Sequence, residues 1–565
     1  MLAAHRRRSS DFSSIVASSE TLTGDLRFPT REECVVPDLL VSRAEATPDK
    51  TFLLFEEEQW TYGDSVREAW RAGNALQSCG VDSGDYVSVW MPTGPDVLRC
   101  WFGANAIGAT YSPLTLAAKG SYLEHTLNLA ESKVLVAHNQ LLERLVGRDL
   151  PHLELVLTVG GDADVELPWR TVPLAEILDG AGEERPTATQ PAEPWDDLSL
   201  IYTSGTTGPS KGVRAAHAAF WNYARCFILP YVTDEDRYLN SLPMFYTAGT
   251  GITYSMLLAG GSVALNKGFN PRTFWDDVRR FDATITIAIH GMVTFLADQP
   301  PSPSDRDHPL KTVYMGPLAR QEEFAERFGV DIYTAFGMAE VPVPITSPLN
   351  PKDVKPGYCG EAADAVHYEL RLVDEHDVPV DVGTPGELVA RHSLPWMINS
   401  GYKNMAEATA NAWRNGWFHT GDEMVQDEEE SFYFLDRKKD VIRRRGVNIS
   451  SFEVEAEVMS HPLVKDVAAI AVKNPDLEEA AGDEEVKIVA VLEPGAELDP
   501  AELVDYLASR VPRHWVPRFI EYMPELPRTP THKVMKAELR DRGAVTPETW
   551  DREKAGIRFK REALT

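Results

Sequence analysis

The sequence predicts an α/β protein with a large layered N-terminal body, a β-rich subdomain and a small α+β C-terminal domain. Three observations predict this fold. The chain has 565 residues, and because one domain usually holds roughly 100–200 residues, several units are expected. Short apolar runs alternate with helix-like segments from about residue 36 to 300, which is typical of α/β layers. Shorter strands and turns follow from about 357 to 435.

The strands expected in the N-terminal body are short apolar runs between polar or glycine-containing stretches. They are expected at 86–92, 198–204, 262–266, 283–289 and 310–315. A segment with helical spacing of its apolar residues, 96–109, follows the first of these strands. In the C-terminal domain, 450–462 is expected to form a helix with a serine cap, and 464–472 and 485–492 are expected to form strands.

Composition restricts the partners and the compartment. The apolar fraction of 43% is typical of a folded protein, and the net charge of −30 repels nucleic acid and anionic membranes. The five cysteines are scattered without a C-x-x-C pair, so we expect no disulfide framework, no zinc site and a cytoplasmic location. No apolar run is long enough to predict a membrane span. Residues 1–30 lack a secretory signal and are expected to be a flexible extension.

The most specific motif is a polar, glycine-rich run directly after the strand expected at 198–204. Its candidate binding residues are Thr203, Ser204, Gly205, Thr206, Thr207, Gly208 and Lys211. Glycines let backbone N–H groups approach an anion, hydroxyls donate to its oxygens, and a lysine adds positive charge. The spacing is not that of a Walker A loop. A polar surface turn is the alternative, but the length of the run after an apolar strand favours a polyphosphate site.

An ordered series of motifs resembles the adenylate-forming superfamily of acyl-CoA synthetases, peptide-synthetase adenylation domains and beetle luciferases. The resemblance covers nearly the whole chain, through WTYGDSVREAW (60–70), AIGATYSPL (106–114), the run at 203–212, LPMFYTAG (242–249), AFGMAE (335–340), GYKN (401–404), GWFHTGD (416–422), DRKKDVIRRRGVNISSFEVE (436–455) and LPRTPTHKVMKAEL (526–539). Each motif alone is weak, and their order carries the resemblance. The segments near 36–62 and 300–311 are most similar to the crotonobetaine/carnitine-CoA ligase-like branch.

The resemblance implies a two-step reaction and a division of the chain. Residues 31–436 would bind ATP and the acyl group, 437–440 would form a hinge with Lys439 at its pivot, and 441–565 would form a mobile lid. The implied activity is ATP-dependent conversion of a carboxylic acid to its acyl-AMP, with pyrophosphate release and then acyl transfer to coenzyme A. Mg²⁺ is the implied cofactor, and a homodimer is left open.

The resemblance also assigns roles in the nucleotide site. Lys533 would bond the acid and the ATP α-phosphate, where a cation stabilises the charge that develops. Glu340 would be catalytic through Mg²⁺, with Thr203 at the same metal. Asp422 would hold the ribose hydroxyls, and Arg437 would add a ribose or phosphate contact. The remaining ATP or AMP contacts would be Phe336, Gly337 and Ala339. The ordinary alternatives are a solvated lysine or glutamate and a turn-capping aspartate.

Two further groups of residues would hold the acid and coenzyme A. The acyl pocket would include Phe245, Tyr246, Thr247, His290, Met315 and Gly316. Their mixture suits an organic acid with an apolar part, without separating aryl, medium-chain and carnitine-like acids. Six of the nine residues from Arg437 to Arg445 are basic, and Arg443, Arg445 and the adjacent Gly446 would contact coenzyme A. A solvated linker is the alternative reading of that basic run.

Four positions depart from the family pattern. Phe336 stands where tyrosine is usual, Tyr246 where histidine is frequent, and His532 where glycine precedes the lysine. Ala339 replaces a threonine that bonds the AMP phosphate, and losing a hydrogen bond to a charged group costs about 1.5–3 kcal/mol. These departures keep open an acceptor other than coenzyme A, namely an amine or a carrier-protein thiol, or a small inorganic acid such as nitrite as substrate. A non-catalytic nucleotide-binding scaffold is the alternative of a different class.

Overall fold

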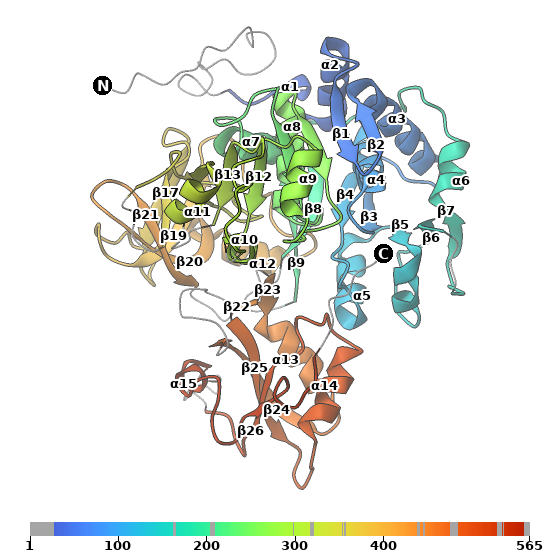
Figure 1. Ribbon diagram of the computed structural model, residues 1–565. Helices are drawn as coiled ribbons and strands as arrows, with labels where there is room; N and C mark the ends of the chain where they lie inside the picture. Colours follow the sequence, from blue (N-terminus) through green and yellow to red (C-terminus); the bar gives the residue numbers. More distant parts are fainter. Residues whose placement is uncertain are drawn as a thin grey trace.

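The fold is taken from a computed structural model of the full chain (Figure 1). It describes residues 27–161, 165–203, 209–297, 299–316, 321–352, 354, 357–437, 441–444, 447–474, 484–527, 534 and 536–558. Of the extension predicted at 1–30, residues 27–30 are among the described ones. The mixed α/β architecture with a large N-terminal part and a small C-terminal domain confirms the predicted fold class.

Two seven-stranded sheets form the centre of the N-terminal body. The first has the order β7 (Arg170–Pro173), β6 (Leu155–Val159), β5 (Val134–His138), β3 (Tyr86–Trp90), β4 (Thr110–Pro113), β8 (Asp197–Thr203) and β9 (Lys211–Ala216). The second has the order β14 (Asp331–Tyr333), β13 (Thr312–Met315), β12 (Ile285–Ala288), β10 (Arg237–Asn240), β11 (Ser262–Leu265), β1 (Thr51–Phe55) and β2 (Glu58–Thr61). Neighbouring strands in these two sheets are parallel except at β8–β9 and β1–β2. The carboxyl ends of most strands therefore lie at one edge of each sheet.

Helices connect and cover these sheets (Figure 1). They are α1 (Arg31–Cys34), α2 (Val36–Ala46), α3 (Tyr62–Ser78), α4 (Pro95–Ala106), α5 (Gly120–Ala130), η1 (Asn139–Leu145), α6 (Leu174–Asp179), α7 (His217–Phe227), α8 (Thr247–Ala259), α9 (Phe274–Arg280), α10 (His290–Ala297) and α11 (Gln321–Phe328). A capping box starts α3, since Thr61 and Asp64 each accept the other's backbone N–H at 3.0 and 2.8 Å. Helix α7 is buried along its whole length, and one apolar core includes residues of α7, α8 and both sheets.

A third, antiparallel sheet forms the predicted β-rich subdomain. Its order is β15 (Ala335–Phe336), β16 (Ile345–Thr346), β17 (Tyr358–Ala362), β21 (Phe432–Arg437), β20 (Phe418–Gln426), β19 (Gly386–His392) and β18 (Tyr368–Val373). Helix α12 (Ala406–Ala412) and the short turn η2 (Arg414–Gly416) precede β20. This sheet carries Phe336 at one end and Asp422 in β20, so it delivers candidate residues from two distant parts of the sequence.

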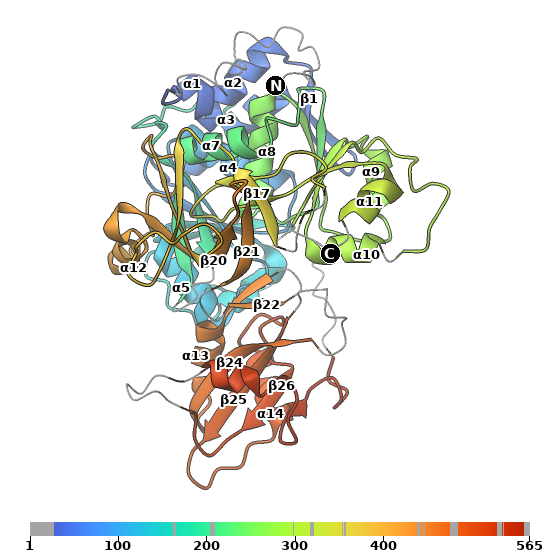
Figure 2. The same ribbon diagram turned by 90° about the vertical axis from the view of Figure 1, so that its left-hand side faces the viewer.

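The C-terminal domain lies beneath the N-terminal body in Figures 1 and 2. It contains the hairpin β22 (Val441–Arg444) and β23 (Val447–Ser450), helices α13 (Ser451–Met459), α14 (Pro500–Ala508) and α15 (Lys536–Asp541), and a sheet of β24 (Val464–Lys473), β25 (Glu484–Leu492), β26 (Phe519–Tyr522) and β27 (Trp550–Asp551). The helix and strands predicted here are confirmed within a few residues. Buried apolar residues of α13, α14 and the sheet form a separate core.

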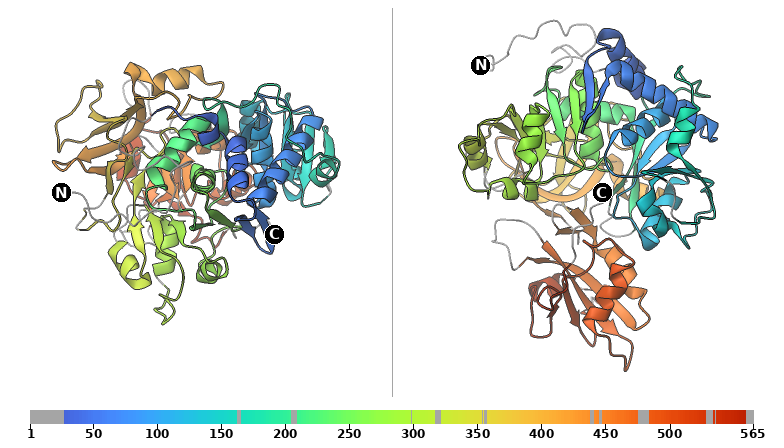
Figure 3. Two further views of the ribbon diagram at one scale, coloured as in Figure 1. Left: turned by 90° about the horizontal axis from the view of Figure 1, so that it is seen from above. Right: turned by 45° about the vertical axis from the view of Figure 1, so that its right-hand side comes forward.

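The two parts meet at α5 and at Ser210, near the end of the predicted phosphate run. Figure 3 (right) shows the C-terminal domain below the N-terminal body. Tyr122 of α5 packs edge-on against Trp515, with 5.3 Å between ring centroids. The Lys119 ammonium donates to the Ala508 carbonyl at 2.7 Å. The Ser210 backbone N–H donates to Glu453 Oε1 at 2.8 Å, and Glu453 is buried. The C-terminal domain therefore contacts Ser210, the residue directly before β9, near the end of the phosphate run.

Candidate functional site

The antiparallel pair β8–β9 holds the two ends of the predicted phosphate run together. Thr203 is the last residue of β8, Lys211 is the first residue of β9, and the strand register pairs them directly. Residues 204–208, which include five of the predicted binding residues, lie outside the described residues. The register nevertheless places Thr203 and Lys211 directly opposite each other.

Glu340 lies beside these two residues. Its carboxylate is 5% exposed, and its Oε1 accepts hydrogen bonds from the Thr203 hydroxyl at 3.3 Å and the Tyr402 hydroxyl at 3.2 Å. The Lys211 ammonium lies 4.7 Å from the centroid of the Tyr402 ring. A buried carboxylate requires such donors, because burial without them is costly. Three predicted site residues, distant in sequence, are thus brought together.

Tyr402 was not among the predicted site residues. Burial, together with the Glu340 carboxylate, raises the pKa of Tyr402 well above its usual value, so the hydroxyl stays protonated and donates. The GYKN motif that contains it was recognised without any chemistry assigned to the tyrosine. Its contact with Glu340 spans 62 positions and depends on the tertiary fold.

The oxygen atoms at this point fit a magnesium ion in the presence of ATP. Mg²⁺ prefers oxygen ligands and is usually held by one or two carboxylates plus substrate phosphates. Glu340 and Thr203 supply a carboxylate and a hydroxyl next to the predicted phosphate run. Among the described residues, no group of three His, Cys, Asp or Glu side chains could hold a metal by itself. The donor set therefore fits a metal that arrives with a phosphate ligand.

Asp422 and Arg437 are paired by the third sheet. They are directly opposite each other in the β20–β21 register, and Asp422 is 1% exposed. The turn before Asp422 is fixed by the Thr420 hydroxyl, which donates to the Leu388 carbonyl at 2.7 Å and accepts the Asp422 N–H at 3.1 Å. The sheet therefore brings the predicted ribose aspartate next to the backbone of its predicted partner.

A buried charged cluster supports the same turn and was missed by sequence reasoning. Glu387 Oε1 accepts the Gly421 N–H at 3.1 Å, while its Oε2 lies 3.3 Å from His419 Nδ1 and 3.2 Å from the Arg414 guanidinium. His419 is almost fully buried. Glu387 lies in the sequence GELVAR at 386–391, but only the strand pairing shows that it meets the residue before Asp422.

The predicted acyl-pocket residues follow strands of the second sheet. Parallel pairing of β10, β12 and β13 places the segments after them at one edge. Phe245, Tyr246 and Thr247 follow β10 at the start of α8, with 4.5 Å between the Phe245 and Tyr246 ring centroids. His290 begins α10 after β12, Met315 ends β13, and Gly316 follows it. The fold thus gathers all three segments, as ligand sites at the carboxyl ends of parallel strands require.

The structure describes some of the remaining nucleotide, hinge and coenzyme A candidates and not others. Phe336 and Ala339 are half-buried close to Glu340, and Gly337 is exposed between them. The Arg443 guanidinium packs 4.7 Å from the Phe434 ring centroid, and its backbone N–H donates to Glu484 Oε2 at 2.7 Å. Its contact with coenzyme A stays a prediction. Lys439, Arg445, Gly446, His532 and Lys533 lie outside the described residues.

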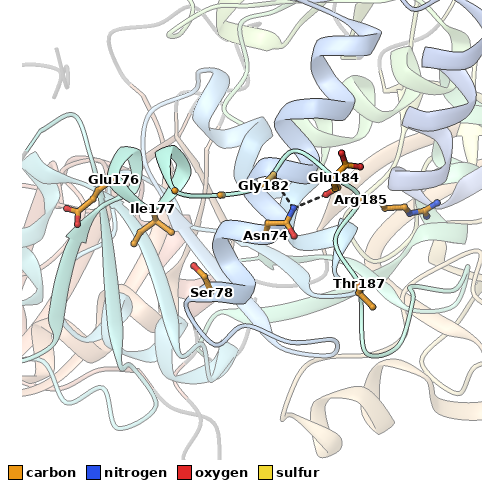
Figure 4. Close-up of a pocket in the computed structure, with 10 residues that line it drawn as sticks. Asn74, Ser78, Glu176, Ile177, Gly182, Glu184, Arg185 and Thr187 are labelled. Carbon is orange, nitrogen blue, oxygen red and sulfur yellow. Dashed lines mark hydrogen bonds between the residues drawn. The ribbon is translucent and has the colours of Figure 1, made fainter.

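A surface groove elsewhere in the N-terminal body does not coincide with this site. It lies between α3 and the segment after α6, and Figure 4 shows Asn74 bridging that segment. The Asn74 amide donates to the Gly182 and Glu184 carbonyls, both at 2.8 Å. None of the predicted site residues lines the groove. The groove is therefore separate from the candidate site around Glu340.

Comparisons with known proteins place the chain in a family. The AMP-binding enzyme family matches residues 40–402, and the AMP-binding enzyme C-terminal domain matches 453–533. The chain belongs to the AMP-binding family of adenylate-forming enzymes, which confirms the resemblance seen in the sequence. Among its relatives, the crotonobetaine/carnitine–CoA ligase of Salmonella typhimurium is 32% identical over 521 residues, covering 87% of this chain and 96% of the relative.

Solved structures agree on the fold. The o-succinylbenzoate CoA synthetase of Bacillus subtilis aligns with a TM-score of 0.76 at 22% identity, covering 90% of this chain and 99% of that one. The amide bond synthetase McbA from Marinactinospora thermotolerans aligns with a TM-score of 0.74 at 24% identity, covering 89% and 99%. Within the described residues, no helix is long and apolar enough to cross a membrane.

Proposed function

We propose that this enzyme is an ATP-dependent acid–thiol ligase. It joins a carboxylic acid to the AMP part of ATP with release of pyrophosphate, and then transfers the acyl group to coenzyme A. The single observation that carries the proposal is the cluster of Thr203, Lys211 and Glu340 at the ends of the predicted phosphate run. The family match and the crotonobetaine/carnitine–CoA ligase relatives support the choice of acid and thiol.

The first step requires two anions to approach each other. The Lys211 ammonium and the backbone N–H groups of the phosphate run offset the triphosphate charge, which lets a carboxylate reach the α-phosphorus. Mg²⁺, held by Glu340 and Thr203, would neutralise phosphate charge when bound with ATP. Asp422 would accept the ribose hydroxyls, with Arg437 beside it. Lys533 would bond the carboxylate and α-phosphate where they meet.

The second step requires the acyl-AMP to meet a thiol. Residues 441–565 form the proposed mobile lid, with Lys439 at the hinge and Arg443, Arg445 and Gly446 towards coenzyme A. The acid would bind at the edge of the second sheet that carries Tyr246 and Met315. All five cysteines are free and four are buried, which supports the proposed cytoplasmic location.

The test is an acid panel with the purified full chain, ATP and Mg²⁺, with and without coenzyme A. The panel includes carnitine, crotonobetaine, aryl acids and medium-chain acids. We expect acid-dependent ATP–pyrophosphate exchange without coenzyme A, and sustained AMP release only when coenzyme A is added. Sustained AMP release with an amine in place of coenzyme A would replace the acceptor in the proposal. Failure to bind ATP would refute the function as a whole.

A matched pair of variants links the activity to the site. Glu340→Gln removes the buried carboxylate charge that would hold Mg²⁺ at the ATP phosphates. Because Mg²⁺ would stabilise the charge on the reacting phosphates, exchange should fall by at least about 100-fold. Glu369→Gln, on the exposed side of β18 and paired with Arg391, should leave exchange unchanged. Equal exchange by the two variants would contradict the assignment of Glu340.

A further inference from the structure

The segment 399–403, between β19 and α12, contacts both the strand that begins with Lys211 and the backbone of Glu340. Its backbone extends β9 as an additional antiparallel strand: Ser400 N–H donates to the Arg214 carbonyl at 2.9 Å, Arg214 N–H to the Gly401 carbonyl at 3.0 Å, and Lys403 N–H to the Gly212 carbonyl at 2.8 Å. These bonds fix residues 400–403 to the strand that begins with Lys211. The segment is therefore rigidly placed next to the phosphate run.

The same segment also holds Glu340 through its main chain. The backbone N–H and the side-chain amide of Asn399 both donate to the Glu340 carbonyl, at 2.9 and 2.8 Å. The Asn399 side-chain oxygen accepts the Gly401 N–H at 2.8 Å, which ties the amide to the docked segment. The backbone of Glu340 and the strand bearing Lys211 thus share one connecting element.

Tyr402 completes this connection with its side chain. Its hydroxyl donates to Glu340 Oε1 at 3.2 Å, while the Lys211 ammonium lies 4.7 Å from its ring centroid. An aromatic ring attracts a cation to its face, and its hydroxyl donates to an anion, so a single tyrosine can orient charges of both signs. Because the Thr203 hydroxyl donates to the same Oε1 at 3.3 Å, two donors define how the carboxylate is turned.

We propose that Tyr402 is a positioning residue that sets the Glu340 carboxylate and the Lys211 ammonium relative to each other for the metal and phosphates of bound ATP. This inference rests on the proposed function and adds a residue to its machinery. Groups that bond a metal ligand usually change metal affinity by about 10–100-fold when removed. The hydroxyl acts on Glu340 and the ring acts on Lys211, so the two contributions are separable by substitution.

The experiment measures ATP affinity by calorimetry over a series of Mg²⁺ concentrations, including none, together with pyrophosphate exchange. Tyr402→Phe keeps the ring and removes the hydroxyl. It should need about tenfold more Mg²⁺ for the same gain in ATP affinity, while metal-free ATP affinity stays at the wild-type value. Tyr402→Leu also removes the ring and should weaken metal-free ATP binding by about threefold or more, as expected for loss of a cation–π contact.

Tyr62→Phe is the matched control. Tyr62 is a fully buried tyrosine whose hydroxyl donates to the Gly261 carbonyl at 2.7 Å in another part of the N-terminal body. A role limited to packing would make the two Phe variants alike, with lower thermal stability and wild-type Mg²⁺ dependence, and would overturn the proposal. A wild-type chain that binds no ATP would refute the proposed function, whereas normal Mg²⁺-dependent binding by Tyr402→Phe would refute the role of Tyr402 alone.

Discussion

Protonation of Glu453 is expected to control how tightly the C-terminal domain docks on the phosphate run. Burial raises the pKa of Glu453 from 4.5 to about 7, and the hydrogen bond from Ser210 only partly opposes that shift. Other titratable neighbours belong to α5: Tyr122, and His125, whose Nε2 bonds the Ser210 carbonyl at 2.8 Å. Docking therefore buries a carboxyl group that prefers to hold its proton.

The sign and size of the effect follow from this shift. Because the pKa is higher in the docked state, docking takes up a proton between pH 4.5 and about 7 and weakens as the pH rises through that range. The difference of 7 − 4.5 = 2.5 units corresponds to about 3 kcal/mol, at about 1.4 kcal/mol per unit. Below pH 4.5 and above about pH 7 the dependence should become flat.

The variant that tests this is Glu453→Gln. The amide oxygen can still accept the Ser210 N–H, but the side chain carries no charge, so docking should be stronger at pH 8 and its pH dependence should disappear. Glu457→Gln is the matched control, because the Glu457 carboxylate accepts a hydrogen bond from the Ser121 hydroxyl of α5 across the same interface. It should weaken docking at every pH while leaving the slope unchanged.

Hydrogen–deuterium exchange of a peptide that contains the Ser210 amide measures docking directly. After correction for intrinsic exchange, wild-type protection should fall about tenfold per pH unit between pH 5.5 and 7. Protection in Glu453→Gln should stay constant over this range. The reasoning is refuted when Glu453→Gln keeps the wild-type slope, or when wild-type protection rises with pH.

Three other substitutions probe different parts of the enzyme. Lys533→Ala should abolish adenylate formation but spare thioester formation from supplied acyl-AMP; equal retention of both half-reactions would contradict the assigned role. Gly337→Ala would place a Cβ 2.8 Å from the Val343 nitrogen and force the backbone to shift, so acid-dependent exchange should fall on the order of 10–100-fold, and full activity would argue against a close-fitting site. Arg225→Met leaves the buried Asp364 carboxylate without its arginine and should cost about 3–5 kcal/mol of unfolding free energy in urea titrations, partly recovered in a double variant with Asp364→Leu.

Local patterns were sufficient to predict most strands and helices of both domains. The apolar run at 86–92 became β3, and the serine-capped segment at 450–462 became α13. The helix predicted at 96–109 ends earlier, at Ala106, because Gly108 adopts a left-handed φ of +75° that stops the helix. Strand and helix periods are local properties, which explains why single-sequence reasoning identifies them.

The connections between distant segments could not be predicted in the same way. Ordered motifs identified Glu340 and Asp422, but no local signal indicated that Tyr402 joins Glu340 to Lys211 or that Glu387 bonds the Gly421 N–H. Both contacts depend on strand register: the docking of 400–403 on β9 and the pairing of β19 with β20. Register is set by the complete hydrophobic pattern and the turns of the folded chain.

The first residue of α5, Gly120, lies at the domain interface where there is no room for a side chain. Gly120 has a φ of +60°, and a Cβ built there would collide with the carbonyl oxygen of Arg510 in the C-terminal domain. Even the methyl group of alanine at this point would push the lid away from the body, while the nucleotide contacts proposed for residues 203–437 of the N-terminal body would remain. The interface thus contains a site where one methyl group could uncouple the two half-reactions and yield an enzyme arrested between them.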